Sequence, residues 1–421
     1  MHLNCVNNFK CENVNNLNYK PCGVHKQGDI IFLLIIVDRK AMEINMKINC
    51  SKELLVDIVN TVQKAVMTKA SLPILECIKI DAHGKGEILV TAYNTDICIE
   101  YRAECDVPMG GDVAIASKMF GEIVRRLPDG NVSLSVNEDN YVTKIKCGAS
   151  EFNIQGFNAK EFPSPPQIEE KYRFTLTQEK LKDLTRKTIS FTAQNEGKRP
   201  ILTGMLFEIK NGFLNVVSSD GHRLAYVKEQ LNDKLEDSKF IIPSQTIREL
   251  LKLLKDEGNV DIIVSSRHVL FDFGYFKLYT RLMDGEFLKY DSLMSVTNTI
   301  ITIADKREIT DCLERAMLLI NEDAITSTNK RSPVRFNINN GKIDIACITG
   351  RGQVNDNVNL KLYEGNELMI GFNCRFILDA LAACDDDDVK LEFSTALGGC
   401  YIKPTNPDGM YSFMILPVRL N

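Results

Sequence analysis

Apolar and polar positions follow the same order of elements three times along the chain. Three segments, starting at residues 47, 172 and 299, each predict a short strand, a polar helix start and an amphipathic helix: KINCSKELLVDIVNTV, YRFTLTQEKLKDLTRKT and TIITIADKREITDCLERAM. In the first segment one helical face carries Leu54, Leu55, Ile58, Val59 and Val62. The three starts are roughly 125 residues apart, which is the size of a small domain.

The segments that follow each start also recur in the same order. PILECIKIDAHGKGEILVTAYN, PILTGMLFEIKNGFLNVVSSD and SPVRFNINNGKIDIACITG each predict a strand, a glycine-containing turn and a second strand. Each is followed by a strand, a helix, an acidic turn and another strand. We therefore expect an α+β protein of three tandem domains over 46–168, 169–297 and 298–421. Each domain is expected to place two helices on one side of antiparallel strands.

Residues 1–45 lie outside this repeat. They are rich in Asn and show neither helical nor strand periodicity before the apolar run Ile30–Val37. That run is too short to cross a bilayer, which needs about 20 residues, and no small-residue cleavage site follows it. We expect this extension to be disordered or to come from a wrongly assigned start, and we expect no membrane partner.

Composition is that of an ordinary globular protein with several domains. The chain has 421 residues, of which 44% are hydrophobic and 25% charged, so it can bury sizeable cores. Its 13 cysteines are scattered and show no spacing typical of a zinc site. Reduced thiols in the cytoplasm are the expectation.

Positive charge is concentrated on the predicted helices. The six helices sum to roughly +7 and the remaining residues to roughly −12, against a net charge of −5 for the whole chain. This separation suits helices that face a phosphate backbone while the outer surface repels nucleic acid, although solvated helix faces are an equally simple explanation. The candidates for phosphate contact are Lys69, Lys118, Arg125, Lys182, Arg186 and Lys252.

Motifs for catalysis are absent from the sequence. It has no G-x-x-x-x-G-K-[ST] loop and no H-E-x-x-H, so we expect neither an enzyme nor a bound cofactor. The acidic run Asp385–Asp388 suggests a metal site, but it occupies the place of an exposed turn in its repeat. The alternative function is a metal-dependent DNA-processing enzyme that uses these aspartates together with His222.

The stretch VVSSDGHRLA, residues 216–225, predicts two strands joined by an Asp-Gly turn. It holds His222, for which the sequence names no orienting carboxylate beyond Asp220, and the turn itself is expected to use that side chain. Two roles stay open for His222: a structural imidazole, or one wall of a pocket for a partner.

Three stretches carry a resemblance to a known family. PILTGMLFE…SSDGHRLA, the DGEF of residues 284–287 and the terminal MILPVRL resemble the bacterial sliding clamp, the beta subunit of DNA polymerase III, over Met46–Asn421. The resemblance implies a non-enzymatic processivity factor that closes as a head-to-tail homodimer around double-stranded DNA. Implied partners are the replicative polymerase, the clamp-loader ATPase, and other replication and repair proteins with clamp-binding motifs.

The resemblance also implies a peptide-binding pocket at the junction of the second and third domains. The matching residues are mostly apolar, as a groove for Leu and Phe side chains requires, and the two arginines are expected to serve peptide carbonyls or carboxylates. They are Leu202, Ser219, Gly221, His222, Arg223, Leu224, Pro243, Ile247, Phe287, Phe376, Leu397, Met414, Ile415, Leu416, Pro417, Val418, Arg419 and Leu420. One departure is that Leu288 follows Phe287 where clamps often have Pro, so the shape of this loop is in question.

The subunit contact of such a ring uses a different surface on each partner. The candidates are Phe152 and Ile154 on an edge strand with Ile123 on a neighbouring helix for one surface, and Leu282 for the other.

Overall fold

The computed structural model describes residues 44–420 apart from 68, 85, 138, 196, 198, 327–331 and 407–408. The expectation for the extension before residue 44 lies outside these residues. Strand β1 begins at Ile44, which pairs with Asn137, two residues before Met46.

The first domain contains two helices, α2 (Lys52–Val62) and α3 (Ser117–Arg126). Its strands are β1 (Ile44–Ser51), β2 (Cys77–Asp81), β3 (Glu87–Tyr93), β4 (Ile97–Glu104), β5 (Asp106–Met109), β6 (Asp112–Ala116), β7 (Asn131–Asn137), β8 (Val142–Cys147) and β9 (Ser150–Phe157).

The second domain repeats this plan with helices α4 (Gln178–Ile189) and α5 (Ser244–Leu251). Its strands are β10 (Tyr172–Thr177), β11 (Gly204–Lys210), β12 (Phe213–Ser219), β13 (Arg223–Gln230), β14 (Ser238–Pro243), β15 (Asn259–Val264), β16 (His268–Asp272) and β17 (Phe276–Arg281).

The third domain follows a linker that contains the short helix α6 (Asp291–Met294), and its own helices are α7 (Lys306–Thr326) and α8 (Cys374–Ala383). Its strands are β18 (Ile300–Asp305), β19 (Val334–Asn339), β20 (Lys342–Thr349), β21 (Gly352–Glu364), β22 (Leu368–Phe372), β23 (Asp388–Phe393), β24 (Cys400–Pro404) and β25 (Tyr411–Ile415). The three domains confirm the predicted α+β repeat.

Polar side chains begin equivalent helices in the repeat. The Ser51 hydroxyl accepts a hydrogen bond from the Leu54 N–H, and the Thr177 hydroxyl accepts one from the Lys180 N–H, both at 3.2 Å. Such caps satisfy one of the backbone N–H groups that a helix leaves without an internal partner. The same strand-to-helix step in two domains therefore rests on the same local chemistry.

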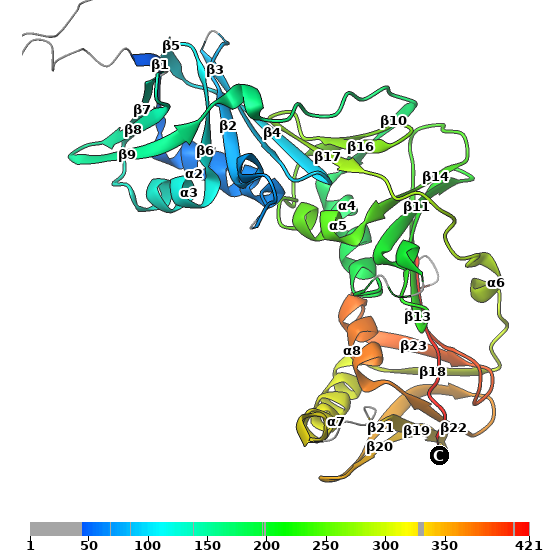
Figure 1. The fold of residues 1–421 in the computed structure, drawn as a ribbon. Coiled ribbons are helices and arrows are strands. Elements are labelled where there is room, and N and C mark those ends of the chain that lie inside the picture. The colour runs from blue at the N-terminus through cyan, green and yellow to red at the C-terminus, as the bar shows by residue number, and fades with distance from the viewer. Residues whose placement is uncertain are drawn as a thin grey trace, which may run out of the picture.

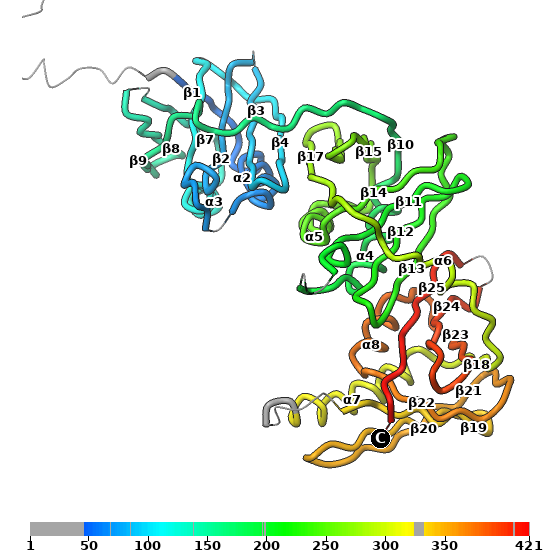
Figure 2. Tube along the Cα trace, turned by 45° about the vertical axis from the view of Figure 1, so that its right-hand side comes forward, coloured from blue at the N-terminus to red at the C-terminus, as the bar shows by residue number. Residues whose placement is uncertain are grey.

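The three domains form a crescent in which the two helices of each domain line the inner side and the strands the outer side, while α6 of the linker lies on the outer side (Figure 1). Buried apolar residues between the helices and the sheets form one continuous cluster from Met46 to Ile415, which we call the helix-side core. Two linkers connect the domains, one between β9 and β10 and one between β17 and β18, and both can be followed in Figure 2.

Neighbouring domains are joined by the same pair of strands at both junctions. The fourth strand of the first domain, β4, pairs with the last strand of the second, β17, and the fourth strand of the second, β13, pairs with the last strand of the third, β25. Each junction is an antiparallel pair that continues the sheet from one domain into the next. At the ends of the crescent, two segments pair on one side only within the described residues: 150–155 of β9 in the first domain and 352–359 of β21 in the third.

Two further predictions concern membranes and cysteines. Among the described residues, no helix has the length and apolar character needed to cross a membrane. All ten cysteines within the described ranges are free thiols, as expected, and nine of them are buried.

Candidate peptide-binding junction and nucleic-acid face

The predicted turn of SSDGHR joins β12 to β13, and two side chains hold it. The Asp220 carboxylate accepts hydrogen bonds from the backbone N–H groups of His222 (2.9 Å) and Arg223 (3.0 Å). The Ser219 hydroxyl donates to the Arg223 carbonyl at 2.7 Å and accepts from the Gly221 N–H at 3.1 Å. Gly221 has φ +88°, a conformation that side chains disfavour. The turn is thus fixed by its own sequence.

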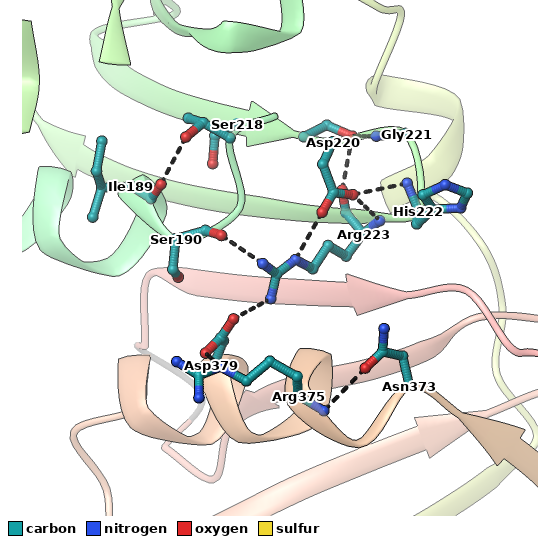
Figure 3. A network of polar contacts seen from close by, with 12 residues as sticks. Ile189, Ser190, Ser218, Asp220, Gly221, His222, Arg223, Asn373, Arg375 and Asp379 are labelled. Carbon is teal, nitrogen blue, oxygen red and sulfur yellow. Dashed lines mark hydrogen bonds and ion pairs between the residues drawn. The ribbon is translucent and has the colours of Figure 1, made fainter. Parts of the chain in front are cut away.

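Arg223 lies inside the junction of the second and third domains (Figure 3). Its guanidinium donates to the Asp220 carboxylate (3.0 Å), to Asp379 of α8 (2.7 Å) and to the Ser190 carbonyl (2.6 Å). It also stacks 4.3 Å from the centre of the Phe376 ring. The residue is 6% exposed, so the prediction that Arg223 serves a bound peptide is wrong. Each guanidinium nitrogen donates to a partner within the protein, and the residue links the two domains.

His222 points outward from the same turn. The residue is exposed, and its ring lies 6.5 Å from that of Phe376 with 24° between the planes. Its carbonyl accepts a hydrogen bond from the Leu416 N–H at 2.9 Å, so the turn holds the C-terminal tail by main chain. The carboxylate of Asp220 stabilises the turn, which leaves the imidazole available to a partner.

A second apolar cluster lies on the outer side of the sheet at this junction. It is separate from the helix-side core, and both domains contribute to it. We call it the outer cluster; its buried members are Leu202, Leu206, Val217, Leu224, Ile241, Phe287, Tyr290, Tyr401 and Met414. Four of these were predicted from the sequence: Leu202, Leu224, Phe287 and Met414. The structure therefore brings together residues that are more than 200 positions apart in the chain.

Two predicted pocket residues belong to the helix-side core. Ile247 of α5 and Ile415 of β25 are fully buried in that cluster, so the prediction that they line the pocket is wrong. Strand side chains alternate between faces, and Met414 already points into the outer cluster, so Ile415 must point the opposite way. Pro243 is the last residue of β14 and directly precedes α5.

The linker after Phe287 supplies residues of the outer cluster that the sequence prediction missed. Leu288, Leu293 and Met294 are partly buried and pack against the outer cluster. The Tyr401 hydroxyl donates to the Leu293 carbonyl at 2.6 Å and so fixes this linker to the third domain. The replacement of the usual Pro by Leu288 therefore leaves a linker that packs on the cluster. A signal was present in the sequence, because LKYDSLM sets three apolar residues in an otherwise polar connection.

The C-terminal tail extends from β25 along the third domain. The Val418 N–H donates to the Gly371 carbonyl at 2.8 Å, and Leu420 packs so closely on Gly371 that a Cβ there would lie 2.5 Å from its side chain. Leu416 and Val418 stay about two-fifths exposed, at 39% and 41%, and Arg419 is exposed. Leu397, in the loop before β24, is 79% exposed. Pro417 lies between the two anchored residues of the tail.

The acidic run after α8 forms ion pairs and hydrogen bonds with side chains of the protein. Asp385 forms ion pairs with Arg186 (2.6 Å) and Lys187 (2.5 Å) of α4. Burial raises the pKa of Asp385, but the hydrogen bonds and charges of these two residues outweigh burial and lower its pKa overall. Asp386 accepts from the Tyr411 hydroxyl and Asp388 pairs with Lys361. The carboxylates thus diverge to separate partners, and the run joins the second domain to the third.

The predicted phosphate-binding residues lie on or beside the helices of the inner side. Lys118 and Arg125 belong to α3, Lys182 and Arg186 to α4, and Lys252 follows α5 directly. Lys69 is exposed in the loop after α2.

Four of these six residues are already paired with acids. Arg125 contacts Glu122 (3.2 Å), Lys182 contacts Asp256 (2.7 Å), Lys252 contacts Glu249 (2.8 Å), and Arg186 contacts both Asp183 and Asp385. Lys69 and Lys118 form no ion pair with any residue of the described part. The inner face is therefore basic, with its charge partly balanced before any phosphate approaches.

The candidates for the subunit contact fall into two groups. Phe152 is 40% exposed on β9, at the free edge of the first domain, whereas Ile154 is 8% exposed on the same strand. Ile123 of α3 is half-buried and packs against the helix-side core. Leu282 directly follows β17 inside the second domain, where its N–H donates to the Arg267 carbonyl. It lies at neither free edge of the crescent, so it does not fit the second surface.

Comparison with known families covers almost the whole described chain. The N-terminal, central and C-terminal domain models of the DNA polymerase III beta subunit match residues 46–166, 175–289 and 292–419, respectively. The beta sliding clamp of Halalkalibacterium halodurans is 32% identical over 370 residues, covering 85% of this chain and 95% of that protein. The beta sliding clamp of Bacillus subtilis is 32% identical over 387 residues, covering 89% and 100%.

Solved structures agree with the sequence comparison. A putative DNA polymerase III beta subunit from Eubacterium rectale superposes with a TM-score of 0.83 at 33% identity, covering 89% of this chain and all of that one. The Bacillus subtilis sliding clamp gives a TM-score of 0.83 at 30% identity, with 90% and 100% covered. The chain therefore belongs to the DNA polymerase III beta subunit family, the beta sliding clamps, which are processivity factors of DNA polymerase.

Proposed function

We propose that two copies of this chain close head to tail into a ring around duplex DNA. The observation that carries this proposal is the repeated use of one strand pair at both domain junctions, β4 with β17 and β13 with β25. A third use of the same pair joins β21 of one copy to β9 of the next. Two crescents of three domains then close without a free edge at either end.

The repeat also gives the register of this contact. Equivalent hairpins pair Tyr93 with Cys98 and Ile348 with Gln353, which makes Gln353 the counterpart of Cys98. Since Cys98 pairs with Tyr279 across the first junction, Gln353 should pair with the counterpart of Tyr279.

That counterpart follows from the last hairpins of the first two domains. In the second domain Asp272 pairs with Lys277, and in the first Lys146 pairs with Glu151, so Glu151 is the counterpart of Lys277. Two residues further along each strand, Asn153 is therefore the counterpart of Tyr279. The expected contact therefore sets Asn153 opposite Gln353 of the other copy.

The same register sets Phe152 opposite Val354. Exposed apolar side chains stand near both edges: Phe152 at the first edge, and Leu318 of α7 (68% exposed) and Ile348 of β20 (62% exposed) at the second. Burying such residues between two copies supplies the favourable free energy of association. We place Phe152, Ile154 and Ile123 on the first surface, and residues 352–356 with Leu318 on the second in place of Leu282.

DNA passes through the ring along the basic inner helices, without sequence preference. The replicative polymerase, other replication and repair proteins and the clamp-loader ATPase dock short peptides at the outer cluster beside His222 and the tail. An apolar floor with a polar rim suits the Leu and Phe side chains of a linear motif. The protein acts in the cytoplasm by encirclement, without catalysis.

Engineered cysteines test the ring contact. Directly opposite residues of an antiparallel pair have Cα atoms about 4.5–5.5 Å apart, within the range for a disulfide. We expect the double variant Asn153→Cys, Gln353→Cys to form a covalent dimer on oxidation. The control is Asn153→Cys with Asn357→Cys, whose partner is displaced by about 13 Å along the strand. Equal cross-linking in both variants, or in neither, would contradict the register.

A further inference from the structure

Two carboxylates face each other at one end of the first domain's outer sheet. Strands β2 and β6 are antiparallel, and the last residue of one, Asp81, pairs directly with the first residue of the other, Asp112. Like charges placed opposite each other across two strands destabilise the pair. A cation bound between the two carboxylates would attract both of them and offset their repulsion.

A histidine completes the group. The Nδ1 atom of His83 lies 2.8 Å from an oxygen of Asp81, and the ligand atoms of Asp81, His83 and Asp112 all lie within 4.8 Å of one another. The Asp112 carboxylate forms no hydrogen bond or ion pair with any residue of the described ranges. Lys79 lies 3.5 Å from the other oxygen of Asp81, and this long ion pair partly balances the two acids.

The backbone brings the two carboxylates together and keeps them there. The Ala82 N–H donates to the Gly111 carbonyl at 2.8 Å, just beyond the two acids. Gly110 permits this approach, because a Cβ at that position would lie 2.9 Å from the Ala82 carbonyl oxygen. The arrangement is thus built by the strand pairing and does not depend on loop positions alone.

Asp112 and His83 also border a cavity of about 280 Å³. Its other walls include Asn158 and Tyr141, which carry oxygen atoms suited to hold ordered water.

We propose that Asp81, His83 and Asp112 bind one divalent transition-metal ion, with water from the cavity as the remaining ligands. Two carboxylates and one imidazole suit ions such as Mn²⁺ or Zn²⁺ better than Ca²⁺, which takes oxygen ligands only. The ion ties the end of β2 to the start of β6, on the outer side of the sheet and away from the DNA-facing helices. This differs from the acidic run 385–388, whose carboxylates pair with separate cations.

Mn²⁺ alone, titrated into the full chain and followed by the electron paramagnetic resonance signal of the free ion, tests this site. Mn²⁺ is the better probe because the 13 cysteines of the chain offer thiolates to Zn²⁺. We expect one saturable site per chain, weakened about tenfold or more in His83→Asn and in Asp112→Asn. Lys79→Gln removes the competing cation and should tighten binding severalfold.

Asp387→Asn is the matched control, because it removes one carboxylate from the acidic run and should leave Mn²⁺ affinity unchanged. His83 is exposed, so His83→Asn and Lys79→Gln keep the fold even if Asp112→Asn does not, and thermal melting verifies this for each variant. The proposal is overturned if no saturable site appears up to about 1 mM Mn²⁺. Unchanged affinity in His83→Asn, or loss of binding in Asp387→Asn, overturns it equally.

Discussion

Arg223 and His222 are neighbours in sequence with opposite roles. The guanidinium of Arg223 is enclosed between two domains by Asp220, Asp379 and the Ser190 carbonyl, whereas the ring of His222 faces outward (Figure 3). A buried cation with several charge-assisted hydrogen bonds fixes the geometry of the groups around it. The junction that carries the candidate peptide groove is therefore held from inside by one side chain.

Removing this side chain should cost stability. Arg223→Met leaves the carboxylates of Asp220 and Asp379 without their buried partner, which we expect to lower the free energy of unfolding by about 3 kcal/mol. Arg375→Met is the matched control, because Arg375 contacts the same Asp379 from an exposed position and should cost under about 1 kcal/mol. Urea unfolding of both variants measures the difference, and equal losses would show that the junction does not depend on Arg223.

The sequence predicted the turn around these residues but not the burial of Arg223. Asp220 and Gly221 determine the turn within a few positions, so local chemistry was enough. Burial of Arg223 depends on Asp379, 156 residues further along the chain, and no spacing in the sequence reveals that contact. The same limit applies to Asp385, whose partners Arg186 and Lys187 lie in another domain.

At the scale of elements, the alternation of side chains along a strand separates the outer cluster from the helix-side core. Met414 and Ile415 are consecutive on β25, and they belong to the outer cluster and the helix-side core, respectively. The period of two was readable in the sequence and would have excluded Ile415 from the pocket. The linker residues Leu293 and Met294 were harder to predict, because a connection between domains has no periodicity that marks a buried face.

The C-terminal tail and the turn form one small site, since the Leu416 N–H donates to the His222 carbonyl. Deleting residues 417–421 and replacing His222 by Ala should each weaken binding of a Gln-Leu-x-Leu-Phe peptide, with less than additive effects in the double variant. Calorimetric titration measures the affinities, and size-exclusion chromatography should show the dimer intact. Unchanged affinity in both single variants would remove His222 and the tail from the groove.

The helices of the inner face should differ in how much each cation contributes to DNA binding. Lys118 has no acidic partner in the described part, so Lys118→Gln should reduce the salt slope of DNA retention by about 0.9, the value for one lost phosphate contact. Lys252→Gln should reduce it less, because Glu249 already balances that charge. Binding measured at several salt concentrations compares the two, and a larger effect at Lys252 would contradict this view of the face.

At the scale of the whole molecule, three copies of one domain create two joined edges and two free ones. The sequence predicted the repeat because each copy has its own periodicity, helix caps and turns. It could not predict which strands join the domains, because β4 and β17 are about 180 residues apart and pair only in the folded chain. Once that pairing is known, the register of a ring contact follows from the same repeat.

Retention on circular DNA tests encirclement most directly. The protein, loaded on a nicked circular plasmid, is passed through a sizing column before and after the plasmid is cut once. A ring that holds DNA by topology should stay on the circle at a salt concentration that abolishes phosphate contacts, and it should be lost when the ends are freed. Equal retention on the circular and the cut plasmid would show that the chain binds the DNA surface and does not encircle it.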